Sequence, residues 1–437
     1  MLHLLAALAL LAPPDPPDAD PRVGWLAAHA TRLRTIDPAD LDFADLAPLK
    51  AAIGDARVVM LGEQSHGDGA TFEARSRLIR FLHDECGFDV LVFESGLWDC
   101  AAMNAHLADD DTADRIAQWG VFPLWSQSEQ CRATFEFAIE AHDSEHPLEI
   151  AGCDSQFSGA AGRSYAADLL AELDRVPGAR LDPAEKKAFV ALHRGIVQSR
   201  MFGAAAPDPN EVGAIDAIDR AMAAPDAPFA PALGARRFEF LRRSLRNVRT
   251  ELVIAHELAE RTPESMQSAS NRRDVLMGEN VVWLANEHFR GRKLIVWAAN
   301  LHLAHSLSTV EVGHDGGATY ASLVTLGDQV HRALGDGAYT ILFTAHAGRA
   351  GMCGQPGFDV PPAENGALED LLHRTGLPYA FLDLRAARRV DDDWRGGAFG
   401  ARPFGYAPCT AKWGGVCDAF LFTDRMYKST IEGEKDG

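Results

Sequence analysis

The sequence predicts an α/β protein with a central, mostly parallel sheet flanked by helices, and with a large helical insertion at about residues 160–290. Short apolar runs that end in polar or glycine-rich sequence alternate with helical segments, which is the pattern of a parallel sheet covered by helices. The insertion is expected because residues 160–290 contain no strand-like run and are rich in Ala, Leu, Arg and Glu. With 437 residues, 47% of them hydrophobic, the chain can bury one large core.

Seven apolar runs are the expected strands, because each is short and is followed by polar residues or glycine. In chain order they are residues 58–63, 90–95, 148–154, 293–300, 339–344, 379–384 and 419–423. Within the insertion, Asp182 followed by Pro183 predicts a helix start, with an N-cap and a proline at the first helical position. Residues 386–417, rich in glycine with interleaved aromatic side chains, are predicted to form a long loop.

The first 21 residues are predicted to be a signal peptide with a proline-rich spacer, and residues 22–437 one α/β domain. Residues 1–12 are apolar except for His3, which suits a signal-peptide core and falls short of the ~18 apolar residues of a membrane span. The export signal is imperfect because this segment carries no Lys or Arg. We expect a periplasmic or secreted protein, with a cytoplasmic one as the alternative.

The net charge of −20 restricts the partners. A field of that sign repels phosphate backbones, so nucleic acids and anionic membrane surfaces are excluded and a small-molecule substrate is favoured. The arginine run at 236–249 is therefore expected to be an ion-paired helix face. The seven cysteines are too scattered for a disulfide framework, although Cys409 and Cys417 flank a loop and form either a bridge or two separate thiols.

A carboxylate and an imidazole three residues apart follow the first expected strand. Glu63 and His66 lie in the sequence Gly-Glu-Gln-Ser-His-Gly, whose glycines, Gly62 and Gly67, allow the backbone to bend sharply. Open parallel sheets bind their ligands at the carboxyl ends of the strands. The two side chains have the composition of a general base and its orienting carboxylate. Alternatively, Glu63 caps the next helix and His66 bonds to a loop.

An arginine lies on the apolar face of the helix that follows. Apolar residues recur at helical spacing from Phe72, and Arg75 falls on the same stripe. A buried guanidinium is costly without a counter-charge, so a carboxylate should lie nearby. Glu94, which follows the second apolar run, is the predicted partner; the alternative is an arginine that extends to the surface past Phe72. With Glu63 and His66, these residues favour a functional site.

Three motifs resemble those of the erythromycin esterase family. The first reads LGEQSHG and is followed by an arginine on the next helix and by VLVFESG, as in the family's Gly-Glu-x-x-His-Gly motif with its later Arg and Glu. Residues 271–284 are similar to the family's Arg-Asp-x-x-Met-x-Glu-Asn helix, and residues 295–302 to its Trp-Ala-His-Asn-x-His strand end. The resemblance covers roughly residues 55–310, with a weaker match in CDAFLFTD near the C-terminus.

The activity that this resemblance implies is hydrolysis of carboxylic ester or lactone bonds without a metal or other cofactor. Macrolide inactivation, and with it antibiotic resistance, is one form of that activity. By the same resemblance His66 is the general base that activates water and Glu63 orients it. Glu94 would hold the base or the water, and Arg75 and His302 would stabilise the oxyanion or position the substrate. An imidazole that titrates near neutrality suits this work.

Four further residues are predicted to bind the substrate, and one family residue is missing. The predicted substrate-binding residues are Gln64, Asp154, Asn300 and His305. Ala299 stands where the family has the first histidine of His-Asn-x-His, so a pocket residue is absent. His305, three residues beyond His302, is the candidate that partly replaces it.

Two other function classes remain open. A metallohydrolase would use Glu63, His66, Glu94 and His302 as ligands, because carboxylates and imidazoles suit Zn or Mn. A non-catalytic small-molecule-binding protein would have kept the site and lost turnover, which is consistent with Ala299. A serine nucleophile is not supported, because the first motif does not have the spacing of G-x-S-x-G.

Overall fold

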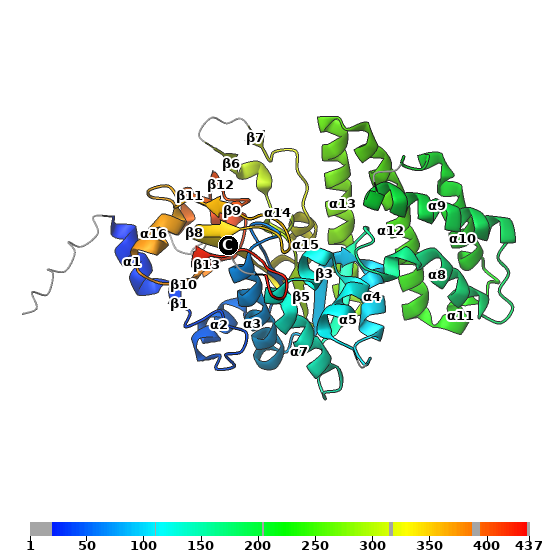
Figure 1. Ribbon diagram of the computed structural model, residues 1–437, viewed down its shortest axis with the longest axis horizontal. Coiled ribbons are helices and arrows are strands. Elements are labelled where there is room, and N and C mark those ends of the chain that lie inside the picture. The colour runs from blue at the N-terminus through cyan, green and yellow to red at the C-terminus, as the bar shows by residue number, and fades with distance from the viewer. Residues whose placement is uncertain (1–19, 110, 203–204, 314–317, 387–393, 435–437) are drawn as a thin grey trace, which may run out of the picture.

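The computed structural model describes residues 20–434 except 110, 203–204, 314–317 and 387–393. The expected signal peptide and nearly all of the spacer therefore lie outside the described residues. Within them, the expected α/β architecture is confirmed. A nine-stranded sheet covered by helices forms one end of the molecule, and the helical insertion forms the other end (Figure 1).

The main sheet is parallel through its centre. Its strands, in order across the sheet, are β1 (Thr31–Arg32), β10 (Tyr379–Asp383), β13 (Ala419–Met426), β8 (Ala338–Ala350), β2 (Val58–Leu61), β5 (Leu294–Trp297), β3 (Val90–Gly96) and β4 (Glu149–Asp154), with β9 (Phe358–Val360) paired to β8. Every pair from β13 to β4 is parallel, whereas β1, β10 and β9 pair antiparallel. All seven apolar runs are strands of this sheet.

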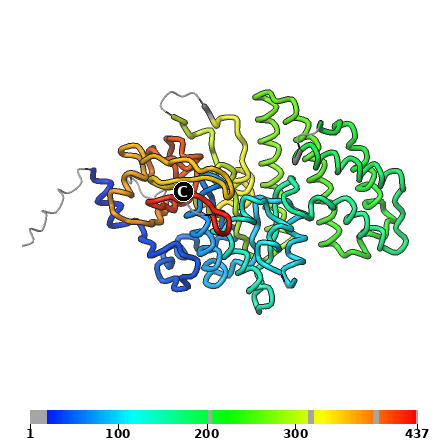
Figure 2. The backbone as a smooth tube through the Cα atoms, viewed as in Figure 1, coloured from blue at the N-terminus to red at the C-terminus, as the bar shows by residue number. Residues whose placement is uncertain are grey.

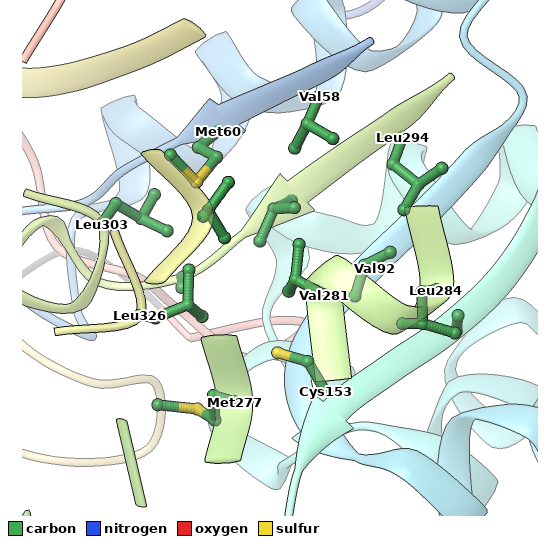
Figure 3. Packing of buried hydrophobic residues seen from close by; sticks show 14 of the residues in the cluster. Val58, Met60, Val92, Cys153, Met277, Val281, Leu284, Leu294, Leu303 and Leu326 are labelled. Carbon is green, nitrogen blue, oxygen red and sulfur yellow. The ribbon is translucent and has the colours of Figure 1, made fainter. Parts of the chain in front are cut away.

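Each face of the sheet is covered by its own helices, because successive residues of a strand point to opposite faces. Val59 and Leu61 of β2 pack in one core and Val58 and Met60 in the other. The first core includes residues of α2 (Ala47–Ile53), α3 (Gly69–Cys86), α5 (Ala113–Gly120) and α7 (Arg132–His142). The second includes residues of α1 (Pro21–His29), α13 (Pro263–Trp283), α15 (Leu326–Leu334) and α16 (Leu368–Arg374). Figure 3 shows Val281 of α13 next to Val92 of β3, within a cluster that also contains Met277, Val58 and Leu294.

The segment between β4 and the start of α13 is helical (Figure 2). The prediction extended this insertion to about residue 290, but α13 packs against the sheet, so the insertion ends near residue 260. Its helices are α8 (Tyr165–Asp174), α9 (Pro183–Phe202), α10 (Gly213–Ala223), α11 (Phe229–Leu233) and α12 (Ala235–Glu260). Asp182 accepts hydrogen bonds from the first amides of α9, which confirms the expected helix start. The arginine run on α12 is ion-paired, since Arg242 bonds Asp219 and Arg246 bonds Glu279.

The prediction of a long loop at residues 386–417 is wrong for its second half. Strands β11 (Phe399–Phe404) and β12 (Ala407–Ala411) form a hairpin, which continues through β6 (Glu311–Val312) and β7 (Ala318–Thr319) as a small antiparallel sheet. Gly405 and Tyr406, the two turn residues, both have positive φ, as in a type I′ turn. Tyrosine rarely adopts that conformation, so the sequence carries no ordinary turn signal.

Two further expectations concern a disulfide bridge and a membrane-spanning helix. Cys409 and Cys417 are thiols, so the alternative with a disulfide bridge between them is wrong. Across the part of the chain that the structure describes, no helix has the length and apolar character needed to cross a membrane.

The α-helices whose bounds have not yet been given are α4 (Leu97–Ala105), α6 (Pro123–Ser126) and α14 (Asn300–Leu303).

Candidate active site

The candidate site lies where four neighbouring parallel strands end. β2, β5, β3 and β4 are adjacent in the sheet, so the residues after them meet at one edge. This is where open parallel sheets hold their ligands. Of the predicted site residues, Glu63 follows β2, Glu94 lies near the end of β3 and His302 lies shortly after β5.

Glu63 and His66 form a hydrogen-bonded pair, as the spacing predicted. Nδ1 of His66 lies 2.6 Å from Oε1 of Glu63. The Glu63 side chain is fully buried, whereas 40% of the His66 side chain is exposed. Burial alone would lower the pKa of His66, but the hydrogen bond and charge of Glu63, with the charge of Glu94, outweigh it and leave the pKa raised. A buried carboxylate thus holds an imidazole that reaches solvent.

Arg75 is fully buried, as its place on the apolar stripe predicted, but its partner is not Glu94. Its guanidinium pairs with Oε2 of Glu63 at 2.8 Å and donates to the carbonyl of Gly62 at 2.5 Å. It also stacks over Trp297, 4.4 Å from the ring centroid. No part of the Arg75 side chain is exposed, so in this structure it contacts Glu63 and not solvent.

Glu94 belongs to a second ion-paired group. Arg273, on α13, donates to Glu94 at 2.8 Å; its Nε donates to both carboxylate oxygens of Asp154, and its Nη2 donates to Oδ2 of Asp154 at 2.7 Å. The other oxygen of Glu94 accepts from the Ala299 amide at 2.9 Å. Burial would raise the pKa of Glu94, but His302 and Arg273 hold it well below its ordinary value. Glu94 is therefore a fixed anion.

His302 lies between two carboxylates. Its Nδ1 is 2.8 Å from Asp274 and its Nε2 is 3.2 Å from Glu94. Burial alone would lower the pKa of His302, but the charges of Asp274 and Glu94 raise it to about 10. His302 is consequently a cation at neutral pH, and its charge acts on His66 together with that of Glu94.

Three of the four residues predicted to bind substrate are buried. Asp154 is fully buried and holds Arg273. Asn300 is also fully buried, and its amide bonds the backbone of Phe343 and the Pro403 carbonyl. Its Oδ1 would lie 1.8 Å from a Cβ at position 62, which explains why that position is glycine. The predicted substrate contacts of Asp154 and Asn300 are therefore corrected to structural roles.

Gln64 bonds residues around the loop that carries Glu63 and His66. It is 6% exposed, and in the amide orientation that satisfies both its polar atoms it donates to Asp68 at 3.2 Å and accepts from the Ala345 amide at 2.8 Å. Asp68 also accepts from Ser65 and from Tyr406, and burial raises its pKa to about 6. The substrate-binding prediction for Gln64 is corrected accordingly.

His305 lies apart from this group. Its ring is 4.1 Å from the ring of His331 on α15, and its amide donates to the Val416 carbonyl. His331 in turn bonds Thr340. These contacts direct His305 toward α15 and β8 instead of toward His302, so it does not replace the missing family histidine at position 299.

The donor set does not fit a metal centre. Among the residues that the structure describes, no three His, Cys, Asp or Glu side chains converge as they would around a metal ion. Glu63 is neutralised by Arg75, and Glu94 by Arg273.

Sequence reasoning missed two kinds of residue. Arg273 and Asp274 stood within a recognised motif, but nothing local indicated that they pair with Glu94 and His302. Trp125, on α6, donates to Glu63 at 3.4 Å and packs edge-on against His66, with 5.7 Å between the ring centroids. It follows no strand and lies in no motif, so no signal pointed to it.

The sequence profile of the erythromycin esterase family matches residues 83–425. The chain belongs to this family. YbfO of Bacillus subtilis (strain 168) is 24% identical over 430 residues, 93% of this chain and 89% of that protein. Erythromycin esterase type II of Escherichia coli is 36% identical over 80 residues, 18% of this chain and 19% of that enzyme.

Solved structures share this fold. A Bacillus cereus protein matches with a TM-score of 0.76 and 17% identity, over 95% of this chain and all of that one. A succinoglycan biosynthesis protein matches with a TM-score of 0.72 and 17% identity, over 94% and 98% of the two chains. A mutant of erythromycin esterase EreC in its open conformation matches with a TM-score of 0.66 and 15% identity, over 93% and 98%.

Proposed function

We propose that the protein is a metal-independent hydrolase of carboxylic esters or lactones, with His66 as the general base for attack by water. The observation that carries this proposal is the pair formed by a fully buried Glu63 and a partly exposed His66 at 2.6 Å. Membership in an esterase family supports the reaction class.

The geometry of this pair suits proton transfer. A carboxylate at Nδ1 favours the tautomer with a proton on that nitrogen, which leaves Nε2 of His66 to accept a proton from water. The water oxygen then bonds to the carbonyl carbon, and the carbonyl oxygen becomes an oxyanion. When the intermediate collapses, the protonated His66 returns its proton to the leaving alkoxide. Water and ester thereby give acid and alcohol with no net change in the protein.

Positive charge for the oxyanion comes from the second ion-paired group. His302, with a pKa of about 10, is a fixed cation whose charge acts on His66. Arg273 has 19% of its side chain exposed. Both cations are held by buried carboxylates, so they are oriented before the substrate binds. Arg75, fully buried beneath Glu63, takes no part in this contact.

The substrate that we propose is a small molecule with an ester or lactone bond. Macrolides are included, because one relative is an erythromycin esterase, although that similarity covers 18% of this chain.

We also propose export on the basis of the apolar residues 1–12. Cell fractionation with the full chain tests this: the protein should be found outside the cytoplasm.

A panel of aliphatic esters, aryl esters, lactones and macrolides tests the function. Chelator-treated protein should hydrolyse at least one member with an unchanged rate. Activity that chelation abolishes and Zn or Mn restores would favour the metallohydrolase instead. Saturable binding without product would favour a binding protein.

A further inference from the structure

The last described segment of the chain passes beside the loop that carries His66. Residues 427–434, which we call the C-terminal strap, follow β13 and curve past the start of α3 (Figure 2). Part of the strap is buried although it belongs to no long element. The exposed fractions are 6% for Lys428, 0% for Ser429 and 9% for Thr430.

The strap pairs backbone to backbone with the residues that follow His66. The Ser429 amide donates to the Gly67 carbonyl at 3.0 Å. Asp68 and Lys428 form an antiparallel bridge next to it. The residues on the C-terminal side of the His66 imidazole are therefore fixed by hydrogen bonds from the other end of the chain.

Two glycines allow this close approach. A Cβ at Gly69 would lie 2.6 Å from the Lys428 carbonyl oxygen, and one at Gly67 would lie 2.2 Å from the backbone of Gly351. Gly351 is itself bonded to Ser429 and to Gly67. The glycine that follows His66 therefore allows close backbone contact with Gly351, and a side chain at this position would clash.

The other side of the strap holds the segment that carries Trp125. Ser429 Oγ lies 2.7 Å from Ser128 Oγ, and the Ser128 amide donates to the Trp125 carbonyl at 3.1 Å. Gln130 binds Thr430 through both ends of its amide, at 2.9 Å each. The strap therefore bridges two segments whose side chains both contact Glu63.

We propose that the C-terminal strap positions His66 against Glu63, with Ser429 and Thr430 as positioning residues. The inference rests on the function proposed above for His66. The family profile ends at residue 425, before the strap begins, so the inference is argued from the contacts of this chain. The strap acts through Gly67 on one side and through Trp125 on the other.

The test is an NMR titration of the His66 imidazole, which needs no substrate, together with steady-state kinetics. The charged groups that face His66 are Glu63, Glu94 and His302. Ser429→Pro removes the amide proton donated to the loop, so the hydrogen bond of Glu63 should loosen and the pKa of His66 should fall. With an active substrate, kcat should fall about tenfold, equivalent to about 1.4 kcal/mol, with KM unchanged. The signal of His66 is assigned by its loss in His66→Ala.

Two matched variants separate positioning from general damage. Ser429→Ala keeps the amide proton donated to Gly67 and removes only the hydroxyl contact with Ser128, so the pKa of His66 should fall less than in Ser429→Pro. Glu432→Gln, on the same strap, removes only an exposed ion pair with Arg132 and should change neither readout.

An unchanged His66 titration in folded Ser429→Pro would overturn the proposal. If the proline variant fails to fold, Thr430→Val takes its place: a lower His66 pKa supports positioning, and an unchanged one overturns it. Because the titration needs no turnover, failure of the strap proposal can be distinguished from failure of the proposed hydrolase function.

Discussion

The ion pair of Arg75 and Glu63 should be essential for stability, because both side chains are fully buried. Arg75→Met removes the cation and leaves a buried carboxylate with only His66 and Trp125 as partners. Breaking a buried pair on one side typically costs ~3–5 kcal/mol, whereas replacing both partners by neutral groups is often nearly neutral. We therefore expect Arg75→Met and Glu63→Gln each to lose about 3–5 kcal/mol, and the double variant to lose much less than their sum.

Urea unfolding followed by tryptophan fluorescence measures these differences. The matched control is Arg77→Met, two residues along the same helix, where a buried guanidinium pairs with Asp45 at 2.7 Å. It should lose comparable stability and keep full activity per folded molecule, while Arg75→Met loses both. Losses below about 1 kcal/mol for Arg75→Met, or strictly additive losses in the double variant, would refute the reasoning.

Three further predictions follow from the same network. The rate of hydrolysis should increase with pH through the pKa of His66, which lies above the ordinary 6.5, because only the neutral imidazole accepts a proton. Glu63→Gln should move this limb of the pH–rate profile to lower pH. A limb that does not move would contradict the role of Glu63 in raising the pKa of His66. The pKa of His302 is about 10 in the folded protein against 6.5 ordinarily, so the stability that its charge contributes is complete below pH 6.5 and is lost as the pH rises to about 10. The difference in unfolding free energy between wild type and His302→Gln, measured by urea unfolding, should therefore close over that range. A difference that stays constant with pH contradicts the assignment. Asn300→Ala leaves buried backbone carbonyls without donors and should cost ~1–3 kcal/mol in unfolding free energy with KM unchanged, whereas a raised KM alone would restore its predicted role in substrate binding.

The sequence was informative where a short stretch of chain determines the outcome. Seven of the nine strands of the main sheet coincide with continuous apolar runs, so their positions could be predicted without knowledge of their neighbours, whereas the short strands β1 and β9 could not. The contact between Glu63 and His66 was equally local, because the two residues are three positions apart on one turn. The inward direction of Arg75 followed from helical spacing alone.

What failed depended on distant contacts. Glu94 pairs with Arg273, 179 positions away in the sequence, and the partner of Arg75 is Glu63. Asn300 was assigned to the substrate because it follows a strand, but only the three-dimensional structure shows that β8 and β11 use both ends of its amide. The hairpin at residues 399–411 was missed for a different reason, its unusual Gly-Tyr turn.

The most direct test of the central claim compares His66→Ala with His106→Ala on the best substrate of the panel. His106 is a matched control because its Nδ1 also lies 2.6 Å from a carboxylate three residues away, that of Asp109, but its ring stacks on Trp119 outside the site. General-base catalysis typically contributes ~10²–10⁴-fold, so His66→Ala should lower kcat by about that factor with an unchanged unfolding midpoint, and His106→Ala should lower it less than about twofold. Equal losses from both variants, or full activity without His66, would show that the imidazole is structural.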